Sequence, residues 1–183
     1  MNSEEQLNKL LSSSQCPMAL KPRRKDKLAA AIAHVKTEAG TEDENVEWAI
    51  VDSGASIHGA DAKKHFKGFR VTPSKHDGLE CTAANGGDMT VRGEQIVHYK
   101  VEEGHQCVTS FLNAGCELPI ISVRKLTRDG NVVVFDRRVK GGYIKHLETG
   151  KMTHFVEKDG VYFLKMIMPK VKRNDDSFGR LGA

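Results

Sequence analysis

The stretch of sequence that decides the fold is WAIVDSGAS, residues 48–56. Its apolar run, residues 49–51, predicts a buried β-strand, and Asp52-Ser53-Gly54 follows this strand directly. Asp, Ser and Gly are common turn residues, so the triplet alone could be an ordinary loop. A buried strand that ends in a carboxylate and a tight glycine turn is also a suitable support for acid–base chemistry. The sequence on either side therefore has to decide between the two interpretations.

Downstream of this stretch, short apolar runs alternate with glycine turns. We expect β-strands over residues 79–84, 88–91, 96–101, 107–112 and 132–135. Asn85-Gly86-Gly87 between two alternating runs predicts a hairpin, because Asn and Gly tolerate positive φ. Residues 119–129 predict the single helix of this body, ended by Gly130, and residues 144–146 and 161–164 predict a final hairpin across Gly150. The predicted fold class is mainly β with one short helix.

Length and composition exclude several classes of protein. The chain has 183 residues, 39% of them hydrophobic and 28% charged, which suits one ordinary domain with tails. No apolar stretch approaches the roughly 20 residues needed to span a bilayer. The N-terminus, MNSEEQLNKLLSSSQ, lacks the apolar region of a secretory signal peptide. These features predict a cytoplasmic protein, with a nuclear location as the alternative.

The net charge of +4 is unevenly distributed along the chain. Residues 1–45 are neutral overall, residues 46–164 carry +1, and residues 165–183 carry +3. The body therefore lacks the strong basic surface of a nucleic-acid-binding domain. Contact with nucleic acid is expected only weakly, through the basic tail.

The cysteines and histidines suggest no metal site. Without a CxxC pair or a signal peptide, we interpret Cys16, Cys81, Cys107 and Cys116 as reduced thiols. A zinc site could be drawn from His98, His105, Cys107 and Cys116, but their spacing matches no compact zinc knuckle. We expect three further histidines to lie on loops or helix surfaces: His58, His65 and His76. No metal or organic cofactor is expected.

Three ordered segments give the chain a family resemblance. Residues 48–58 resemble the active-site signature of retropepsin-like aspartic proteases, in particular those of copia-type retrotransposon polyproteins. Residues 118–135 are similar to the closing strand, helix and last strand of retropepsins. Residues 160–164, GVYFL, resemble the end of the pre-integrase segment that follows the protease in those polyproteins. The resemblance covers about residues 46–165, roughly two thirds of the chain.

The resemblance implies a retropepsin-like closed β-barrel, the half-fold of acid proteases. The implied domains are a leader, mostly disordered with marginal helices (1–45), a protease domain (46–138), a pre-integrase-like β-hairpin extension (139–168) and a basic disordered tail (169–183). The zinc knuckle that usually lies upstream in such polyproteins is missing, which predicts that the chain is a fragment or a degenerate copy. In an intact element, the protein would belong to a virus-like particle.

The resemblance also implies the residues of an active site. Asp52 would be the catalytic residue, supported by Ser53, Gly54 and Ala55, and Ala84, Asn85, Gly86 and Gly87 would form a flap over a polyprotein peptide. Two carboxylates are needed, sharing one proton, as in the aspartic-protease dyad. The chain has only one Asp-[Ser/Thr]-Gly, so the enzyme would act as a homodimer with an Asp52 from each subunit. A mildly acidic rate optimum is expected.

Two other functions remain open from the sequence. The chain could be a catalytically inactive dimerisation or interaction module that keeps the retropepsin fold. It could also be a nucleic-acid-binding accessory segment led by its basic tail, for which steeply salt-dependent binding would be the signature.

Overall fold

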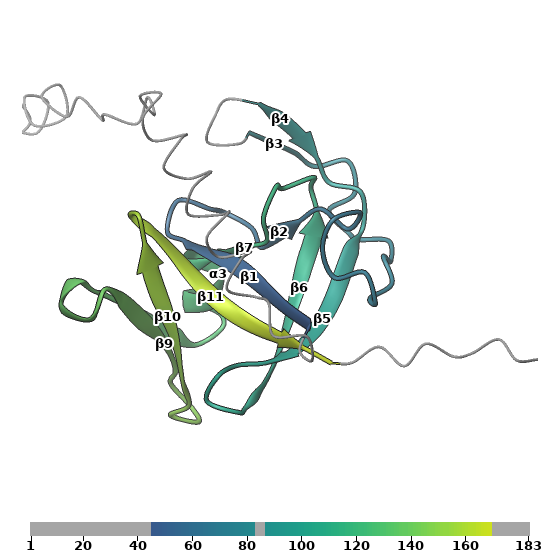
Figure 1. The fold of residues 1–183 in the computed structure, drawn as a ribbon. Coiled ribbons are helices and arrows are strands. Elements are labelled where there is room, and N and C mark those ends of the chain that lie inside the picture. Colours follow the sequence, from purple (N-terminus) through teal and green to yellow (C-terminus); the bar gives the residue numbers. More distant parts are fainter. Residues whose placement is uncertain (1–44, 83–86, 170–183) are drawn as a thin grey trace, which may run out of the picture.

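The computed structural model describes residues 45–82 and 87–169, which are mainly β (Figure 1). The expectations for the leader, for the tip residues 83–86 and for residues 170–183 of the tail lie outside this part of the chain. Its elements are β1 (Asn45–Asp52), β2 (Gly59–Ala60), β3 (Glu80–Thr82), β4 (Asp88–Thr90), β5 (Glu94–Lys100), β6 (Gln106–Asn113), β7 (Ile120–Ser122), α3 (Val123–Arg128), β8 (Asn131–Asp136), the 3-10 helix η1 (Arg137–Val139), β9 (Gly141–His146), β10 (Met152–Lys158) and β11 (Val161–Met168).

Nine strands form one sheet in the order β1-β7-β2-β6-β5-β11-β10-β9-β8, and β3 and β4 form a separate two-stranded sheet. Strand β1 also pairs with β11, so the ladder that starts at β1 returns to it. The β5–β11 step of this ring is a single residue pair, Lys100 with Ile167. The prediction of a mainly β fold is therefore confirmed. The expected closed barrel is not clearly formed, because one paired position is too little to make β5 and β11 a continuous ladder.

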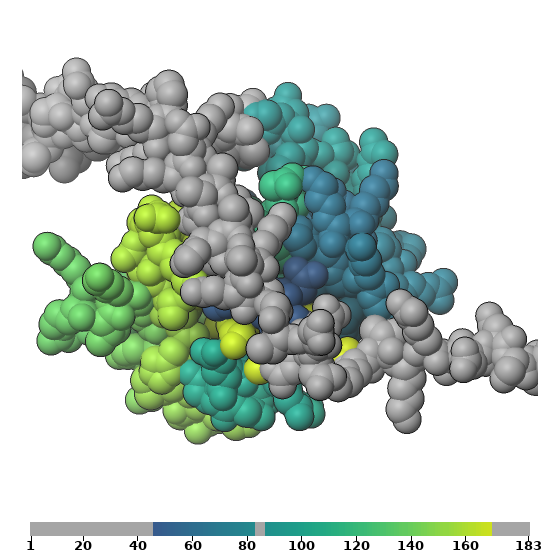
Figure 2. Space-filling model, in the orientation of Figure 1, coloured from purple at the N-terminus to yellow at the C-terminus, as the bar shows by residue number. Residues whose placement is uncertain are grey.

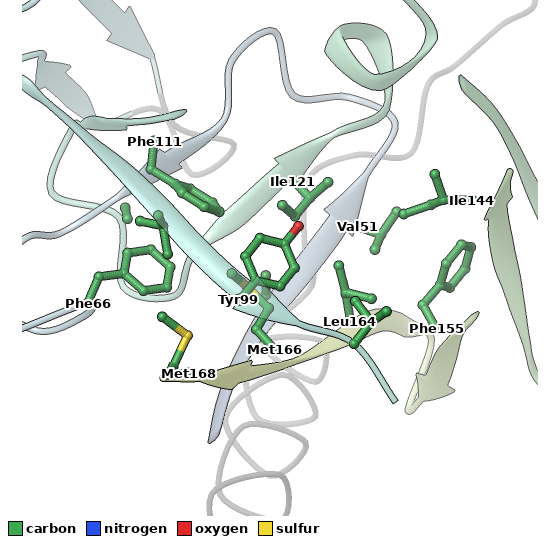
Figure 3. Packing of buried hydrophobic residues seen from close by; sticks show 14 residues of the cluster. Val51, Phe66, Tyr99, Phe111, Ile121, Ile144, Phe155, Leu164, Met166 and Met168 are labelled. Atoms are coloured by element: carbon green, nitrogen blue, oxygen red, sulfur yellow. The ribbon is translucent and has the colours of Figure 1, made fainter. Parts of the chain in front are cut away.

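Alternating side chains place the core on one face of the sheet. In β5, residues 95, 97 and 99 are buried, whereas residues 96, 98 and 100 are exposed, as the two-residue repeat of a strand requires. The buried cluster includes Val51 and Ala49 of β1 and Leu164 and Met166 of β11 (Figure 3). The strand that ends at Asp52 is thus held by apolar packing on its core face.

The helix is shorter than the sequence predicted. Residues 119–129 were expected to be helical, but Ile120 to Ser122 form β7, which pairs in parallel with β1. The β-branched residues Ile120 and Ile121 favour a strand once β1 offers a pairing partner. Ser122 then caps α3, with its side chain accepting a hydrogen bond from the Lys125 N–H, and Gly130 follows the helix with φ of +78°.

The prediction of a final hairpin between residues 144–146 and 161–164 is wrong, because the sequence analysis did not predict β10, which lies between them. Strand β9 pairs with β10 across Gly150, and β10 pairs with β11 across Asp159-Gly160. Residues 152–158 carry four polar residues that hid the alternating pattern of a strand. Strand β11 pairs with β1 over six residues, from Asn45–Met168 to Ile50–Phe163. Residues 139–168 therefore continue the sheet that carries Asp52 instead of extending away from it.

The space-filling view shows on which sides of the molecule these strands lie. The green and yellow residues of β8–β11 form one side of the molecule, and the blue and teal residues that follow β1 form the other (Figure 2). In the part of the chain that the structure describes, the helices are too short or too polar to span a bilayer.

Candidate active site

Asp52 is the last residue of β1 and stands beside Ser122 of the parallel strand β7. Its side chain is half-buried, and Oδ1 accepts a hydrogen bond of 2.7 Å from the Gly54 backbone N–H. A Cβ atom at Gly54 would lie 3.3 Å from this oxygen, which is tighter than most contacts of that kind. Glycine therefore lets the turn close on the carboxylate, and one of the two oxygens is fixed by the backbone.

A hollow of about 340 Å³ opens beside the carboxylate. Its lining comes from three parts of the chain: Ile50, Val51, Asp52 and Ser53; Phe135; and Gly160, Val161 and Tyr162. The Phe135 and Tyr162 rings meet edge to face, with centroids 4.7 Å apart. Asp52 and the exposed Ser53 thus form the polar end of a largely apolar hollow, to which β8 and β11 contribute.

Ser122 fixes the turn that follows Asp52. This residue is fully buried, and its Oγ donates a hydrogen bond of 2.6 Å to the Ala55 carbonyl oxygen. The same Oγ accepts from the Lys125 N–H at 3.2 Å. One hydroxyl therefore joins the turn after Asp52 to the first turn of α3. Sequence reasoning missed this role, although a serine before a helical stretch is the usual signal of a helix cap.

His58 lies behind the same turn and is buried, with 5% of its surface exposed. Its Nδ1 accepts a hydrogen bond of 3.0 Å from the Ser122 backbone N–H. Burial and, to a smaller extent, the Lys125 ammonium lower the pKa of His58 to about 4, with Asp129 partly opposing them. The ring is neutral at neutral pH. His58 lies in a loop, as expected, but the sequence did not predict its burial, which follows because β2, directly after it, pairs with β6 and β7.

His65 also lies in a loop and is likewise buried. This ring is 7% exposed, with Nδ1 3.1 Å from a Glu47 carboxylate oxygen and Nε2 2.9 Å from the Glu117 carbonyl oxygen. The carbonyl can only accept, so Nε2 is the donor. His65 therefore holds the beginning of β1 to the loop before β7. His76 is half-buried in a turn.

The hairpin expected to form the flap is present as β3 and β4, paired with Cys81 opposite Met89. Cys81 and Met89 pack in one apolar cluster with Ile57, which follows the turn after Asp52, and Ile120 of β7. In Figure 1 the hairpin lies above the turn that follows β1. The described residues of β3 and β4 do not line the Asp52 hollow. The tip residues Ala84, Asn85 and Gly86 lie outside the described part, and Gly87 is exposed before β4.

The residues from which a zinc site could be drawn are placed apart. Cys116 packs in the apolar cluster beneath the hairpin, whereas Cys107 packs against the main core and His98 is exposed on β5. Over residues 45–82 and 87–169, no three His, Cys, Asp or Glu side chains are grouped to hold a metal ion.

No protein-family model and no curated protein matches this chain.

Proposed function

We propose that this protein is a retropepsin-like aspartic endopeptidase, a piece of a copia-type retrotransposon polyprotein, and that Asp52 is its catalytic residue. The observation that carries the proposal is the position of Asp52. Its carboxylate ends a buried strand, is held by the Gly54 N–H at 2.7 Å, and faces an open hollow lined by apolar and aromatic side chains. Such a carboxylate is fixed in place yet reachable from outside the chain.

The chemistry requires a second carboxylate. In the proposed homodimer, the Asp52 side chains of two subunits face each other and share one proton, because two adjacent negative charges cannot both ionise. The ionised partner takes a proton from water as the water attacks the scissile carbonyl. The protonated partner donates its proton to the developing oxyanion. The partner that took the proton from water then passes it to the leaving amine, while a hydroxyl of the intermediate returns a proton to the other carboxylate as the C–N bond breaks.

The proposed substrate is an extended segment of the polyprotein. Such a segment would lie between the dyad and the β3–β4 hairpin, its backbone paired as an added strand. The packing of Cys81 and Met89 on Ile57 and Ile120 supports this, because it anchors the base of the hairpin next to the turn after Asp52. The hollow beside Asp52 would then receive a substrate side chain.

The test is cleavage of a fusion protein in which this chain keeps its native flanking sequence. We expect the unaltered chain to cleave the fusion and the Asp52→Asn variant to lose at least 100-fold in rate, since general acid–base catalysis contributes about 10²–10⁴-fold. Asp159→Asn is the matched control: it makes the same chemical change at an Asp-Gly turn and keeps a residue type that tolerates the observed φ of +51°.

Two results would overturn the proposal that this protein is a protease. If Asp52→Asn cleaves as fast as the unaltered chain, the carboxylate has no catalytic role. If neither chain cleaves while both form dimers in sedimentation experiments, the protein is the inactive interaction module considered above.

A further inference from the structure

A second hollow, of about 450 Å³, lies between β6, α3, β9 and β10 and shares no residue with the Asp52 hollow. Its buried lining residues are His58, Tyr99, Ile144, Thr153 and Leu164. The half-buried Lys125 of α3 and the exposed Lys151 lie around them. The hollow has the volume of small-molecule sites and combines aliphatic side chains with many polar ones.

His58 places a hydrogen-bond donor in this hollow. A backbone N–H can only donate, so the bond from Ser122 N–H requires Nδ1 of His58 to be unprotonated. The neutral ring then carries its hydrogen on Nε2. Within residues 45–82 and 87–169, Nε2 has no hydrogen-bond partner, and it is not among the fully buried unpaired atoms. The small accessible area of Nε2 therefore belongs to the hollow that His58 lines. This leaves one hydrogen-bond donor in the hollow without an acceptor.

The charges around the hollow favour an anion. Lys125 lines the same hollow as His58. Lys125 makes no ion pair with any residue in the described ranges, and Lys151 adds a second positive charge. Asp129 is the one carboxylate of the lining. Two further histidines of the lining each use one ring nitrogen within it, His105 toward Thr153 and His146 toward Thr149. The unpaired donor, the two ammonium groups and the one opposing carboxylate suit a ligand with a single negative charge.

Three aliphatic side chains of the lining could contact an apolar ligand body. Ile144 and Leu164 are 8% and 2% exposed, and Leu126 of α3 lies beside them in the lining. Figure 3 shows Tyr99, Leu164 and Ile144 packed in the same core. A phosphate would leave this apolar surface unused, and its second charge would meet Asp129. Nor does the lining contain an arginine to bind phosphate at two points.

We propose that this pocket binds a small organic monocarboxylate with an apolar body, whose carboxylate accepts hydrogen bonds from His58 Nε2–H and Lys125 Nζ. The apolar body contacts Leu126, Ile144 and Leu164. The proposal does not depend on the protease activity. The ligand nevertheless contacts the ring that holds Ser122, and Ser122 holds the Ala55 carbonyl of the turn after Asp52.

The test is a titration of the ¹⁵N-labelled full chain with sodium benzoate at neutral pH, followed by NMR. We expect benzoate to shift the His58 Nε2 resonance and the Lys125 amide, and benzamide, the uncharged analogue, to shift them far less. Lys125→Met should weaken benzoate binding about tenfold, because it removes a charge-assisted hydrogen bond. Lys145→Met, on the exposed side of β9 and outside the lining, should leave it unchanged.

Three outcomes would overturn the proposal. Benzoate could leave both resonances unmoved at 50 mM, roughly 50 times a millimolar dissociation constant. Benzamide could bind as tightly as benzoate, which would make the site a neutral apolar pocket. Inorganic phosphate could shift the same resonances at lower concentration than benzoate, which would assign the site to phosphate.

His58→Asn, which keeps an acceptor near Nδ1 but removes Nε2–H, should lose benzoate binding while its amide spectrum remains that of a folded chain.

Discussion

Ser122 joins three parts of the candidate active site through its own polar atoms. Its N–H donates to His58, its Oγ donates to the Ala55 carbonyl, and the same Oγ accepts from the Lys125 N–H. The residue is fully buried, so water cannot replace these partners. An unsatisfied buried polar group costs about 1–3 kcal/mol, so this single hydroxyl contributes strongly to the free energy of unfolding.

Ser122→Ala should therefore destabilise the protein more than the loss of a surface hydroxyl. We expect the free energy of unfolding in urea to fall by about 2 kcal/mol, because the Ala55 carbonyl loses its donor and α3 loses its cap. Thr127→Ala is the control: its exposed hydroxyl bonds only to the Arg124 carbonyl within the helix. Equal losses in the two variants would show that Ser122 has no special role.

His58 should make the stability of the protein depend on pH. Its pKa is about 4 in the folded chain and about 6.5 when unfolded, so between these values the unfolded chain binds a proton that the folded chain does not. The free energy of unfolding should fall as the pH drops from about 6.5 to 4, by about 3 kcal/mol in total from this group.

The measurement is a series of urea unfolding curves between pH 7 and pH 4. His58→Asn should flatten the slope, whereas His98→Asn, at an exposed position on β5, should leave it unchanged. If His58→Asn keeps the slope of the unaltered chain, another group causes the acid sensitivity.

At the scale of elements, β11 is the strand on which the candidate site depends most. It pairs with β1 along six residues and provides Val161 and Tyr162 to the hollow beside Asp52. Phe163, opposite Ile50, is fully buried. The strand that carries the catalytic residue is thus held by a strand more than 100 positions later in the chain.

A chain that ends at Arg138 should consequently not fold. It would keep Asp52 but lose β9, β10 and β11, exposing the long edge of β1 and the apolar residues that face Phe163. We expect its amide NMR spectrum to show the narrow dispersion of an unfolded chain, whereas the full chain at the same concentration shows a dispersed β spectrum. A dispersed spectrum from the shortened chain would show that residues 46–138 are a domain of their own.

At the scale of the whole molecule, the proposed enzyme is complete only as a dimer, because each chain supplies one Asp-Ser-Gly. If subunits exchange freely and a mixed dimer is inactive, an equal mixture of unaltered and Asp52→Asn chains contains roughly one quarter active dimers. Cleavage per total protein should then fall to about a quarter of that of the unaltered protein. A fall to one half would mean that each chain works alone.

Local patterns predicted much of the fold because they depend on neighbours in the sequence. The strand before Asp52, the β3–β4 hairpin, strands β5, β6 and β8 and the glycine after the helix all follow from apolar alternation and turn residues. The start of the helix and strand β10 were misjudged. Ile120 pairs with β1 as part of a strand, and β10 mixes polar and apolar residues on both faces and is stabilised by two neighbouring strands. A short window of sequence does not show which distant strands will pair with these segments.

The sequence by itself determined that a single carboxylate follows a buried strand in a mainly β chain, because strand periodicity and turn chemistry are encoded locally. Only the tertiary structure decided that His58 and His65 are buried, that Ser122 holds the turn after Asp52, and that Phe135 and Tyr162 line the hollow beside Asp52. These features depend on contacts between residues 50 to 110 positions apart. Such contacts form when burial of apolar surface brings distant strands together, and no spacing along the chain specifies them.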